Sequence, residues 1–318
     1  MRIAIISDIH GNYPAFVKVL EDARAEGVDK FIFLGDYSVY DFPWPNEVAR
    51  ELREMENAYI VRGNKEEYMP HFREKKPDEI IGDRDGGLYQ SVRALTQENY
   101  DFLYGLADEM HIRLAPDVLV YAAHSTPICE NEKGRLPYKF CNNNIYRQAM
   151  ADKPFTHEEF LAEYHDFINS DICLPYIQSI DANIIMYGHN HIQMHAYCGD
   201  KLIINPGSCG LPADCNNKAA YTILEIIGNK FNVIEKRISY DIEAVIAYLR
   251  ASDLYKNARV ISELNIHDLR VGSMNTYLLT DIIREVAAAK NEEIAGAFSC
   301  SETTWAEAGE RFITKYVV

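Results

Sequence analysis

The apolar positions of the chain fall into short runs, and the first run ends at a cluster of polar residues. This run, residues 1–7, is rich in β-branched side chains and predicts a buried strand. It is followed by Asp8, His10 and Gly11, and the glycine allows the backbone to turn. Because alternate residues leaving a strand point the same way, Asp8 and His10 can converge on one ion. Taken alone, an Asp-x-His triplet is weak evidence.

The same pattern of strand and polar cluster recurs farther along the chain. Apolar residues at helical spacing over 13–26 predict a helix that ends at Gly27. Further strands are predicted over 30–34, 58–61, 111–114, 118–123 and 182–187, and further helices over 46–56, 88–106 and from Thr156 towards Ile168. Strands that alternate with helices indicate an α/β protein, in which ligands bind beyond the carboxyl ends of the strands.

The type of predicted secondary structure changes twice in the last part of the chain. Short strands are predicted over 195–198, 202–204, 221–226 and 231–237, and the reading is helical from Asp241 onward. We therefore expect a main domain over 1–238 and a C-terminal helical extension over 239–318. Residues 126–154 are irregular, which predicts a lid-like insertion.

Composition restricts the class of protein. The 318 residues are 47% hydrophobic and 25% charged, and no apolar run approaches the ~20 residues that cross a bilayer. The net charge of −16 disfavours long nucleic acids as partners. Seven scattered cysteines without a Cys-x-x-Cys pair, and an N-terminus that lacks a signal-peptide pattern, predict reduced thiols and a cytoplasmic location.

Seven residues that could bind metal each lie where a predicted strand becomes a loop. They are Asp8, His10, Asp36, Asn64, His124, His189 and His191. Each alone has an ordinary structural explanation, such as a turn acid or a core histidine. Their shared placement instead predicts a joint site at the edge of one sheet. Carboxylate, carboxamide and imidazole ligands without thiolate favour Mn²⁺, with Fe or Zn²⁺ as alternatives.

The order of these motifs resembles that of the calcineurin-like binuclear metallophosphoesterases. The motifs are Asp8-x-His10, Gly35-Asp36, Gly63-Asn64, His124 and Gly188-His189-x-His191. The Asp-x-His-Gly-Asn opening and Asn205-Pro206-Gly207-Ser208 further resemble the small bacterial and archaeal phosphodiesterase branch of that superfamily. The resemblance covers roughly residues 1–238 and implies a four-layer α/β/β/α sandwich with two divalent metal ions at the sheet edge.

The resemblance also implies how the ligands are divided. Asp8, His10 and His191 would hold one metal, and Asn64, His124 and His189 would hold the other. Asp36 would bridge both ions. The implied reaction is hydrolysis of a phosphodiester or phosphomonoester by a metal-bridging hydroxide, with a small anionic phosphate ester as substrate. A nucleotide or a dinucleoside polyphosphate is one candidate.

The sequence departs from the family pattern at Lys65, where many relatives have a histidine proposed as general acid. The candidates for catalytic roles are therefore His10, Asn64 and Lys65. Lys65 could instead neutralise substrate phosphate or lie solvated in a loop. Asn12 either contacts substrate phosphate or serves the turn.

The insertion is the expected determinant of substrate, because tyrosines and basic residues alternate within it. Tyr138, Lys139 and Arg147 could stack a base and pair with outer phosphates, or they could belong to a solvated surface loop. Two other functions stay open. A metal-poor scaffold of the same fold is one, and a serine/threonine protein phosphatase is the other, although Lys65 argues against the latter.

Overall fold

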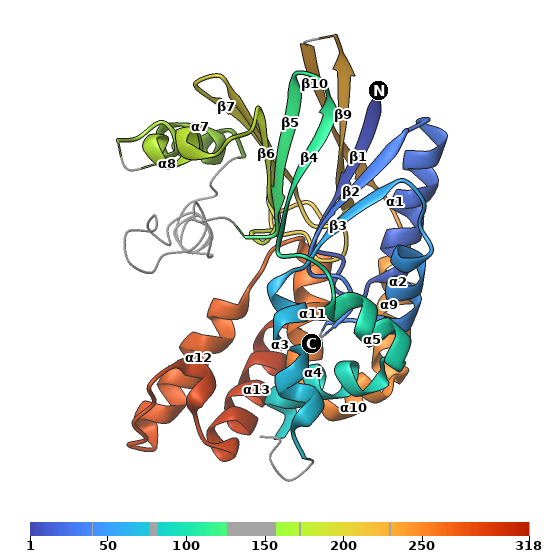
Figure 1. The fold of residues 1–318 in the computed structure, drawn as a ribbon. Helices are drawn as coiled ribbons and strands as arrows, with labels where there is room; N and C mark the ends of the chain where they lie inside the picture. The colour runs from blue at the N-terminus through green and yellow to red at the C-terminus, as the bar shows by residue number, and fades with distance from the viewer. Residues whose placement is uncertain (40, 77–81, 126–156, 172, 229, 318) are drawn as a thin grey trace.

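The computed structural model describes the chain except for residues 40, 77–81, 126–156, 172, 229 and 318 (Figure 1). Ten strands and most of the helices expected from the sequence are present among the described residues. The expected insertion over 126–154, together with Tyr138, Lys139 and Arg147, lies outside the described residues.

The first sheet has five strands in the order β10-β9-β1-β2-β3. Its strands are β1 (Arg2–Ile6), β2 (Lys30–Leu34), β3 (Ala58–Val61), β9 (Ala219–Ile227) and β10 (Lys230–Ile238). β1, β2 and β3 run parallel, whereas β9 pairs antiparallel with β1 and with β10. The central position of β1 explains its apolar sequence, since such a strand is covered on both faces.

The second sheet also has five strands, in the order β4-β5-β6-β8-β7. They are β4 (Glu109–Ala115), β5 (Val118–Ala123), β6 (Ile184–Met186), β7 (Gln193–Cys198) and β8 (Lys201–Pro206). β5, β6 and β8 are parallel, and antiparallel strands flank them on both sides. Both sheets are therefore mixed. The parallel strands occupy one side of the first sheet, out to the edge strand β3, and the centre of the second.

The two sheets pack face to face, with helices on the outer faces (Figure 1). Ile3 and Ile5 of β1 face the second sheet, whereas Ala4 and Ile6 face α1 (Tyr13–Ala25) and α2 (Pro45–Arg53). This split follows from the alternation of side chains along a strand. α7 (His157–Ile168) and α8 (Leu174–Ser179) cover the outer face of the second sheet. The expected four-layer α/β/β/α arrangement is confirmed.

A group of helices lies beyond the carboxyl ends of the parallel strands (Figure 1). They include α9 (Ile242–Ala251), α10 (Asp253–Asn257), α11 (Arg259–Val271), α12 (Thr276–Ala289), the 3-10 helix η2 (Ala297–Ser299) and α13 (Glu302–Tyr316). α11, α12 and α13 share a core that includes Leu264, Ile283 and Phe312. The helical reading from Asp241 onward is thus present in the structure.

Two helical predictions need correction. The sequence predicted one helix over 88–106, but the chain forms α4 (Gly82–Ala94) and α5 (Gln97–Tyr104), because Thr96 caps the second helix by accepting from Asn99 N. The helix α3 (Asn64–Glu74) was not predicted. Its buried residues are Glu66 and Met69, so it lacks the apolar stripe that marks most helices.

Candidate metal centre

The seven strand-end residues converge at the carboxyl ends of strands from both sheets. Asp8 and His10 follow β1, Asp36 follows β2, and Asn64 is the first residue of α3, directly beyond β3. His124 follows β5, and His189 and His191 follow β6. The prediction of one sheet edge is corrected here, because the packing of two sheets brings two sets of strand ends together.

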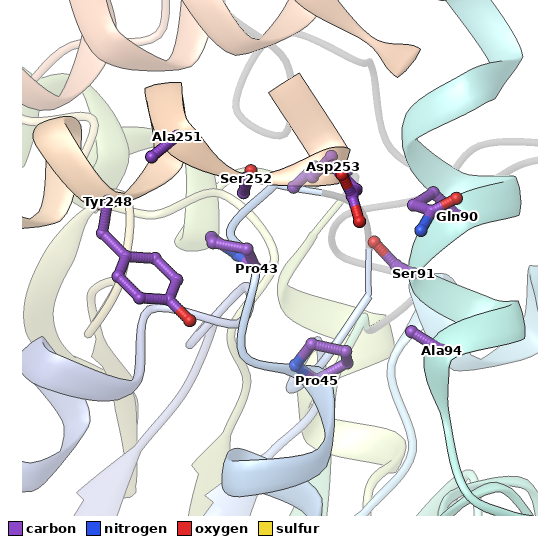
Figure 2. Close-up of a pocket in the computed structure, with 10 residues that line it drawn as sticks. Pro43, Pro45, Gln90, Ser91, Ala94, Tyr248, Ala251, Ser252 and Asp253 are labelled. Carbon is purple, nitrogen blue, oxygen red and sulfur yellow. The ribbon is translucent and has the colours of Figure 1, made fainter. Parts of the chain in front are cut away.

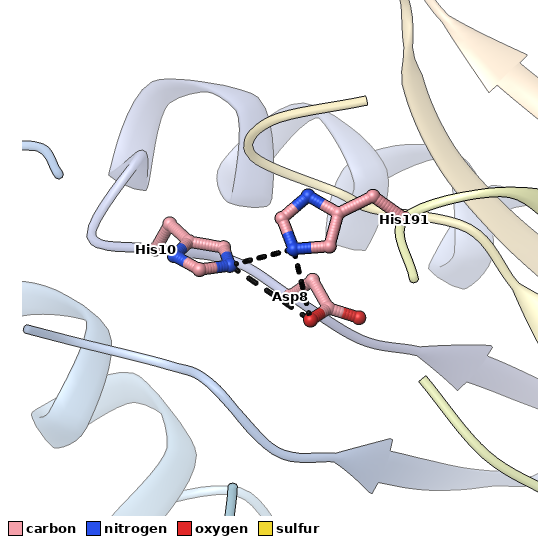
Figure 3. A group of neighbouring side chains, drawn as sticks. All are labelled: Asp8, His10 and His191. Atoms are coloured by element: carbon pink, nitrogen blue, oxygen red, sulfur yellow. Dashed lines mark hydrogen bonds and ion pairs between the residues drawn. The ribbon is translucent and has the colours of Figure 1, made fainter. Parts of the chain in front are cut away.

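One half of the cluster consists of Asp8, His10 and His191 (Figure 3). The Nε2 atoms of His10 and His191 are 3.1 Å apart, and they lie 3.8 Å and 3.3 Å from Asp8 Oδ1. Bonds of about 2.1 Å to a common ion would separate neighbouring ligand atoms by about 3.0–3.4 Å. The three side chains, all buried, thus lie close to the spacing of ligands around one ion.

The other half contains Asn64, His124 and His189. Asn64 Oδ1 lies 3.0 Å from His124 Nε2 and 3.1 Å from His189 Nδ1. The two ring nitrogens are 3.2 Å apart. This triangle is more compact than that of the first half, whose longest side is 3.8 Å. Asn64 and His189 are less buried than the three residues of the first half.

Asp36 lies between the two halves. Its Oδ1 is 3.4 Å from His124 Nε2, and its Oδ2 is 3.8 Å from His10 Nε2. Each carboxylate oxygen therefore faces a different half of the cluster. The backbone N–H of Lys65 donates to Oδ1 at 2.9 Å and fixes the orientation of the carboxylate.

Hydrogen bonds to the backbone orient two of the imidazoles. His124 Nδ1 donates to Leu34 O and His191 Nδ1 donates to Leu211 O, both at 2.6 Å. A carbonyl can only accept, so the proton of each neutral ring sits on Nδ1 and Nε2 turns a lone pair towards the centre. Asp8 Oδ1 is buried and has no hydrogen-bond partner among the described residues. These donor atoms fit a divalent cation.

The backbone at the centre is unusual. Five of the seven residues have positive φ angles: Asp8 (53°), His10 (54°), Asp36 (55°), His189 (71°) and His191 (60°). Non-glycine residues rarely adopt this left-handed region, and where they do the strain is held by the surrounding structure. Such strain is concentrated at functional sites, which matches the role predicted from the sequence.

Glycines before two residues of the cluster, Asn64 and His189, allow backbone segments to approach closely. A Cβ at Gly63 would overlap the backbone nitrogen and Oδ1 of Asp36. A Cβ at Gly188 would overlap the Ser7 hydroxyl and lie 2.7 Å from Asp8 Oδ2. The lack of space for a Cβ thus explains why glycine precedes Asn64 and His189 in this fold.

Sequence reasoning missed Glu66, a fully buried acid in the first turn of α3. Its carboxylate accepts from the backbone N–H groups of Asp36, Tyr37 and Gly63 at 2.9–3.0 Å. It therefore ties the loop after β2 to the start of α3. Burial, followed by the nearby Asp36 carboxylate, raises the pKa of Glu66. The spacing of a capping box, with an acid three residues after Gly63, was the available signal.

Sequence reasoning also missed Asp41, which is buried beside His10. Asp41 Oδ2 accepts from His10 Nδ1 at 2.5 Å, so His10 also directs Nε2 into the centre. Asp41 Oδ1 accepts from Asn265 Nδ2 of α11 at 3.1 Å. No sequence motif marks either residue, because Asp41 lies in an irregular loop and Asn265 is 224 positions away.

The electrostatics of the centre follow from these contacts. Burial opposes a charged imidazole at His10, but Asp41 outweighs it and raises the pKa of His10 to about 10. Burial is likewise outweighed at His124, where Asp36 raises the pKa to about 10. Burial and the charge on His124 together lower the pKa of His189 to about 4. The acidic groups thus make the centre attractive to cations.

Two other candidate residues, Lys65 and Asn12, lie near the cluster in different surroundings. The side chain of Lys65 lines a cavity beside the cluster. Asn12 is buried, and its side chain caps α1 by accepting from Ala15 N while its amide donates to Gly210 O at 2.9 Å and to the hydroxyl of Tyr240 at 3.2 Å. Asn12 therefore has a structural role, and its contact with substrate is still a prediction.

The cavity beside the cluster has a volume of about 260 Å³ and is bordered by His10, Asp36, Lys65 and His191. A larger cavity of about 410 Å³ lies elsewhere, between the loop with Pro43, the helix α4 and the α9–α10 corner (Figure 2). None of the seven cluster residues borders that second cavity. A further cavity of about 220 Å³ borders the other half of the cluster, at Asn64 and His124. The cluster thus borders the two smaller of these three cavities.

Comparison with known proteins agrees with this geometry. A relative, an uncharacterized protein of Methanocaldococcus jannaschii, is 27% identical over 255 residues, which cover 76% of this chain and 88% of the relative. The crystal structure of a metallophosphoesterase from Sphaerobacter thermophilus matches with a TM-score of 0.59 and 23% identity, over 86% of this chain and 99% of that chain. A hypothetical protein from Pyrococcus horikoshii matches with a TM-score of 0.58 and 17% identity, over 82% and 97%.

The two solved structures show the shared fold, and a family model extends the result to function. The model describes calcineurin-like phosphoesterases and matches residues 1–193, which is more than half of the 318 residues. The matched range contains all seven residues of the cluster, including the Asp and His groups that could hold metal. The chain therefore belongs to the calcineurin-like phosphoesterase family and is a metal-dependent phosphoesterase.

Proposed function

We propose that the protein is a binuclear phosphoric ester hydrolase that acts on a small anionic phosphomonoester or phosphodiester. The observation that carries the proposal is the position of Asp36, whose two oxygens face different halves of the cluster at 3.4 Å and 3.8 Å. In this proposal Asp8, His10 and His191 would hold one ion, and Asn64, His124 and His189 would hold the other. Asp36 would serve both.

The donor set supports Mn²⁺, with Fe or Zn²⁺ as alternatives, because it combines carboxylate, carboxamide and imidazole without thiolate. When bound, two such ions would activate a water molecule and neutralise charge on the phosphoryl group. The two ligand carboxylates, Asp8 and Asp36, leave a dinuclear centre with excess positive charge. Such a centre attracts an anionic ester to an otherwise acidic protein.

Three protein groups near the centre have further roles in the proposal. His10 Nδ1 is engaged by Asp41, so its Nε2 is the atom available to the centre, as a ligand or as a proton donor. The Lys65 side chain borders the same cavity. Burial opposes the charged form of Asp41, but His10 and, to a smaller extent, Lys65 lower the pKa of this carboxyl group. We propose that Lys65 contacts the phosphoryl group or the leaving oxygen, and that the Asn64 amide orients the second half of the centre.

Two wider assignments complete the proposal. The division into a main domain over 1–238 and a helical extension over 239–318 is supported by the change from β10 to α9 at that point. A cytoplasmic location is supported by the described cysteines, which are free thiols. No helix in the described part of the chain is both long and apolar enough to span a membrane.

The proposal is tested by metal analysis and by assays on the full chain. The wild type, reconstituted with Mn²⁺, should bind about two ions per chain and hydrolyse aryl phosphate monoesters or diesters. Asp36→Asn should lose at least a hundredfold in kcat, whereas the exposed control Asp253→Asn should retain full activity. The proposal is wrong if the wild type binds metal and hydrolyses none of these esters.

The same experiment separates the two other functions. Fewer than one bound ion per chain after reconstitution would favour a metal-poor scaffold. Hydrolysis of phosphoserine peptides with no turnover of small aryl esters would favour a protein phosphatase. The seven filled ligand positions are the observation against the scaffold.

A further inference from the structure

The cavity beside the metal centre has two walls of different origin. The inner wall consists of the strand-end loops, with His10, Asp36 and His191. The outer wall comes from the C-terminal helices. Its apolar members are Ile261, Leu264, Met274 and Phe298, and its polar members include Asn265 and Asp268. A phosphoryl group held at the inner wall would therefore direct the rest of the substrate towards the C-terminal helices.

Specific contacts fix the outer wall to the loops of the centre. Asn265 donates to Asp41, whose other oxygen holds His10. On the same helix, Ile266 and Leu269 pack in one core cluster with Phe42 and Leu211 from the strand-end loops. One buried hydrogen bond and one apolar cluster thus fix this wall to the rest of the site.

The chemistry of this wall restricts the leaving group. Four apolar side chains offer contact to carbon atoms, and the aromatic ring of Phe298 is 39% exposed. Lys65 is the one lysine or arginine among the described residues that border the cavity. The carboxylate of Asp41 also borders the cavity and would repel a second phosphate. A volume of about 260 Å³ suits a small organic group.

We infer that the C-terminal helices form the leaving-group pocket of the enzyme and select phosphate esters with a compact, uncharged and partly apolar leaving group. This inference rests on the proposed phosphoesterase function and deepens it. An aryl or nucleoside alcohol satisfies these requirements. A dinucleoside polyphosphate does not, since its leaving group carries further phosphates that the described part of this wall has no cation to bind.

Binding of two phosphonates to the Mn²⁺-loaded full chain tests the inference without turnover. Methylphosphonate and phenylphosphonate carry the same anionic group and differ in the group that would enter the pocket. Calorimetry should show that the wild type binds phenylphosphonate at least tenfold more tightly than methylphosphonate. Phe298→Ala and Met274→Ala should each reduce this preference about three- to tenfold, because each removes contacts to the ring. Affinity for methylphosphonate should stay unchanged.

Phe298 and Met274 are partly exposed, so these variants are expected to fold. Tyr248→Ala is the matched control, since Tyr248 is a 53% exposed aromatic residue on the border of the other cavity (Figure 2). It should keep the wild-type preference. Equal binding of both phosphonates by the wild type, or an unchanged preference in both variants, would overturn the inference.

Enzyme kinetics, together with the binding data, distinguish a failure of this inference from a failure of the proposed function. In Phe298→Ala, KM for an aryl phosphate should rise severalfold with kcat nearly constant, because the variant loses contact with the leaving group and not with the reacting atoms. Failure of the wild type to bind either phosphonate would count against the metal centre itself. Normal methylphosphonate binding without phenyl preference would count against the pocket alone.

Discussion

Asn265 on α11 donates a hydrogen bond of 3.1 Å to Oδ1 of Asp41. Both residues are buried, and the other oxygen of Asp41 accepts from the ring of His10 at 2.5 Å. A helix near the C-terminus is thereby linked through one carboxylate to a proposed metal ligand near the N-terminus. Groups that hold a metal-binding imidazole in place affect metal affinity strongly.

The first prediction concerns this contact. Asn265→Ala leaves Asp41 with one hydrogen-bond partner fewer, so the orientation of His10 becomes less well defined. We expect the affinity for Mn²⁺ to fall about tenfold in calorimetry. As a control, Asn99→Ala removes a buried amide of α5 that donates to Asn46 of α2, and it should leave metal affinity unchanged. Wild-type affinity in Asn265→Ala would show that Asp41 orients His10 without help from α11.

A second prediction concerns the close approach at Gly63. A Cβ there would overlap the backbone and carboxylate of Asp36, which cannot move without leaving its position between the two halves of the cluster. We expect Gly63→Ala to lose at least one of the two bound ions and more than a hundredfold in kcat, measured by elemental analysis and hydrolysis of an aryl phosphate. Gly296→Ala is the control, because a Cβ at that position has no heavy atom within 4 Å. Full metal content in Gly63→Ala would contradict the steric argument.

A third prediction concerns the buried acid Glu66. Its two oxygens accept three backbone N–H groups, and a glutamine offers one acceptor and one N–H₂ group in their place. We expect Glu66→Gln to lower the free energy of unfolding by about 2 kcal/mol in urea titrations, since at least one buried donor is left without an acceptor. The exposed neighbour on the same helix provides the comparison, and Glu67→Gln should change stability by less than about 0.5 kcal/mol.

These residues show which parts of the site a sequence can and cannot reveal. The convergence of Asp8, Asp36 and His189 was predictable, because each lies two or three residues beyond a strand with a clear apolar pattern. That the strands belong to two sheets was not predictable. Asp41 was not predictable, since its partners depend on how a loop and a distant helix pack. The helix α3 was missed for a related reason, as its buried positions are occupied by an acid and a methionine and form no apolar stripe.

The same limit applies to the C-terminal helices. Their apolar spacing predicted helices correctly, yet nothing in that spacing indicated that Leu264 and Phe298 would border the metal centre. A pattern of apolar residues indicates that one face of a helix is buried, but it does not identify what covers that face. The leaving-group pocket therefore became visible from the tertiary structure alone.

The last prediction concerns pH and the carboxyl group of Asp268 on α11. Burial raises the pKa of Asp268 well above its ordinary value of 3.8. The hydrogen bonds from Asn275 oppose this rise, and the charge on Asp41 adds to it. A carboxyl group with a raised pKa in the folded state favours folding fully below the unfolded pKa, and this contribution is lost as pH rises through the folded pKa. The wild type should therefore lose stability relative to Asp268→Asn as pH increases from about 4.

The amide oxygen of the variant can still accept from the backbone and side chain of Asn275, which bond to Oδ1 at 2.9 Å and 2.8 Å. In urea titrations at several pH values, the difference in free energy of unfolding between Asp268→Asn and the wild type should grow by at most about 1.4 kcal/mol per pH unit. A constant difference for Asp268→Asn would mean that the folded and unfolded pKa values of this carboxyl group are equal, in conflict with its burial.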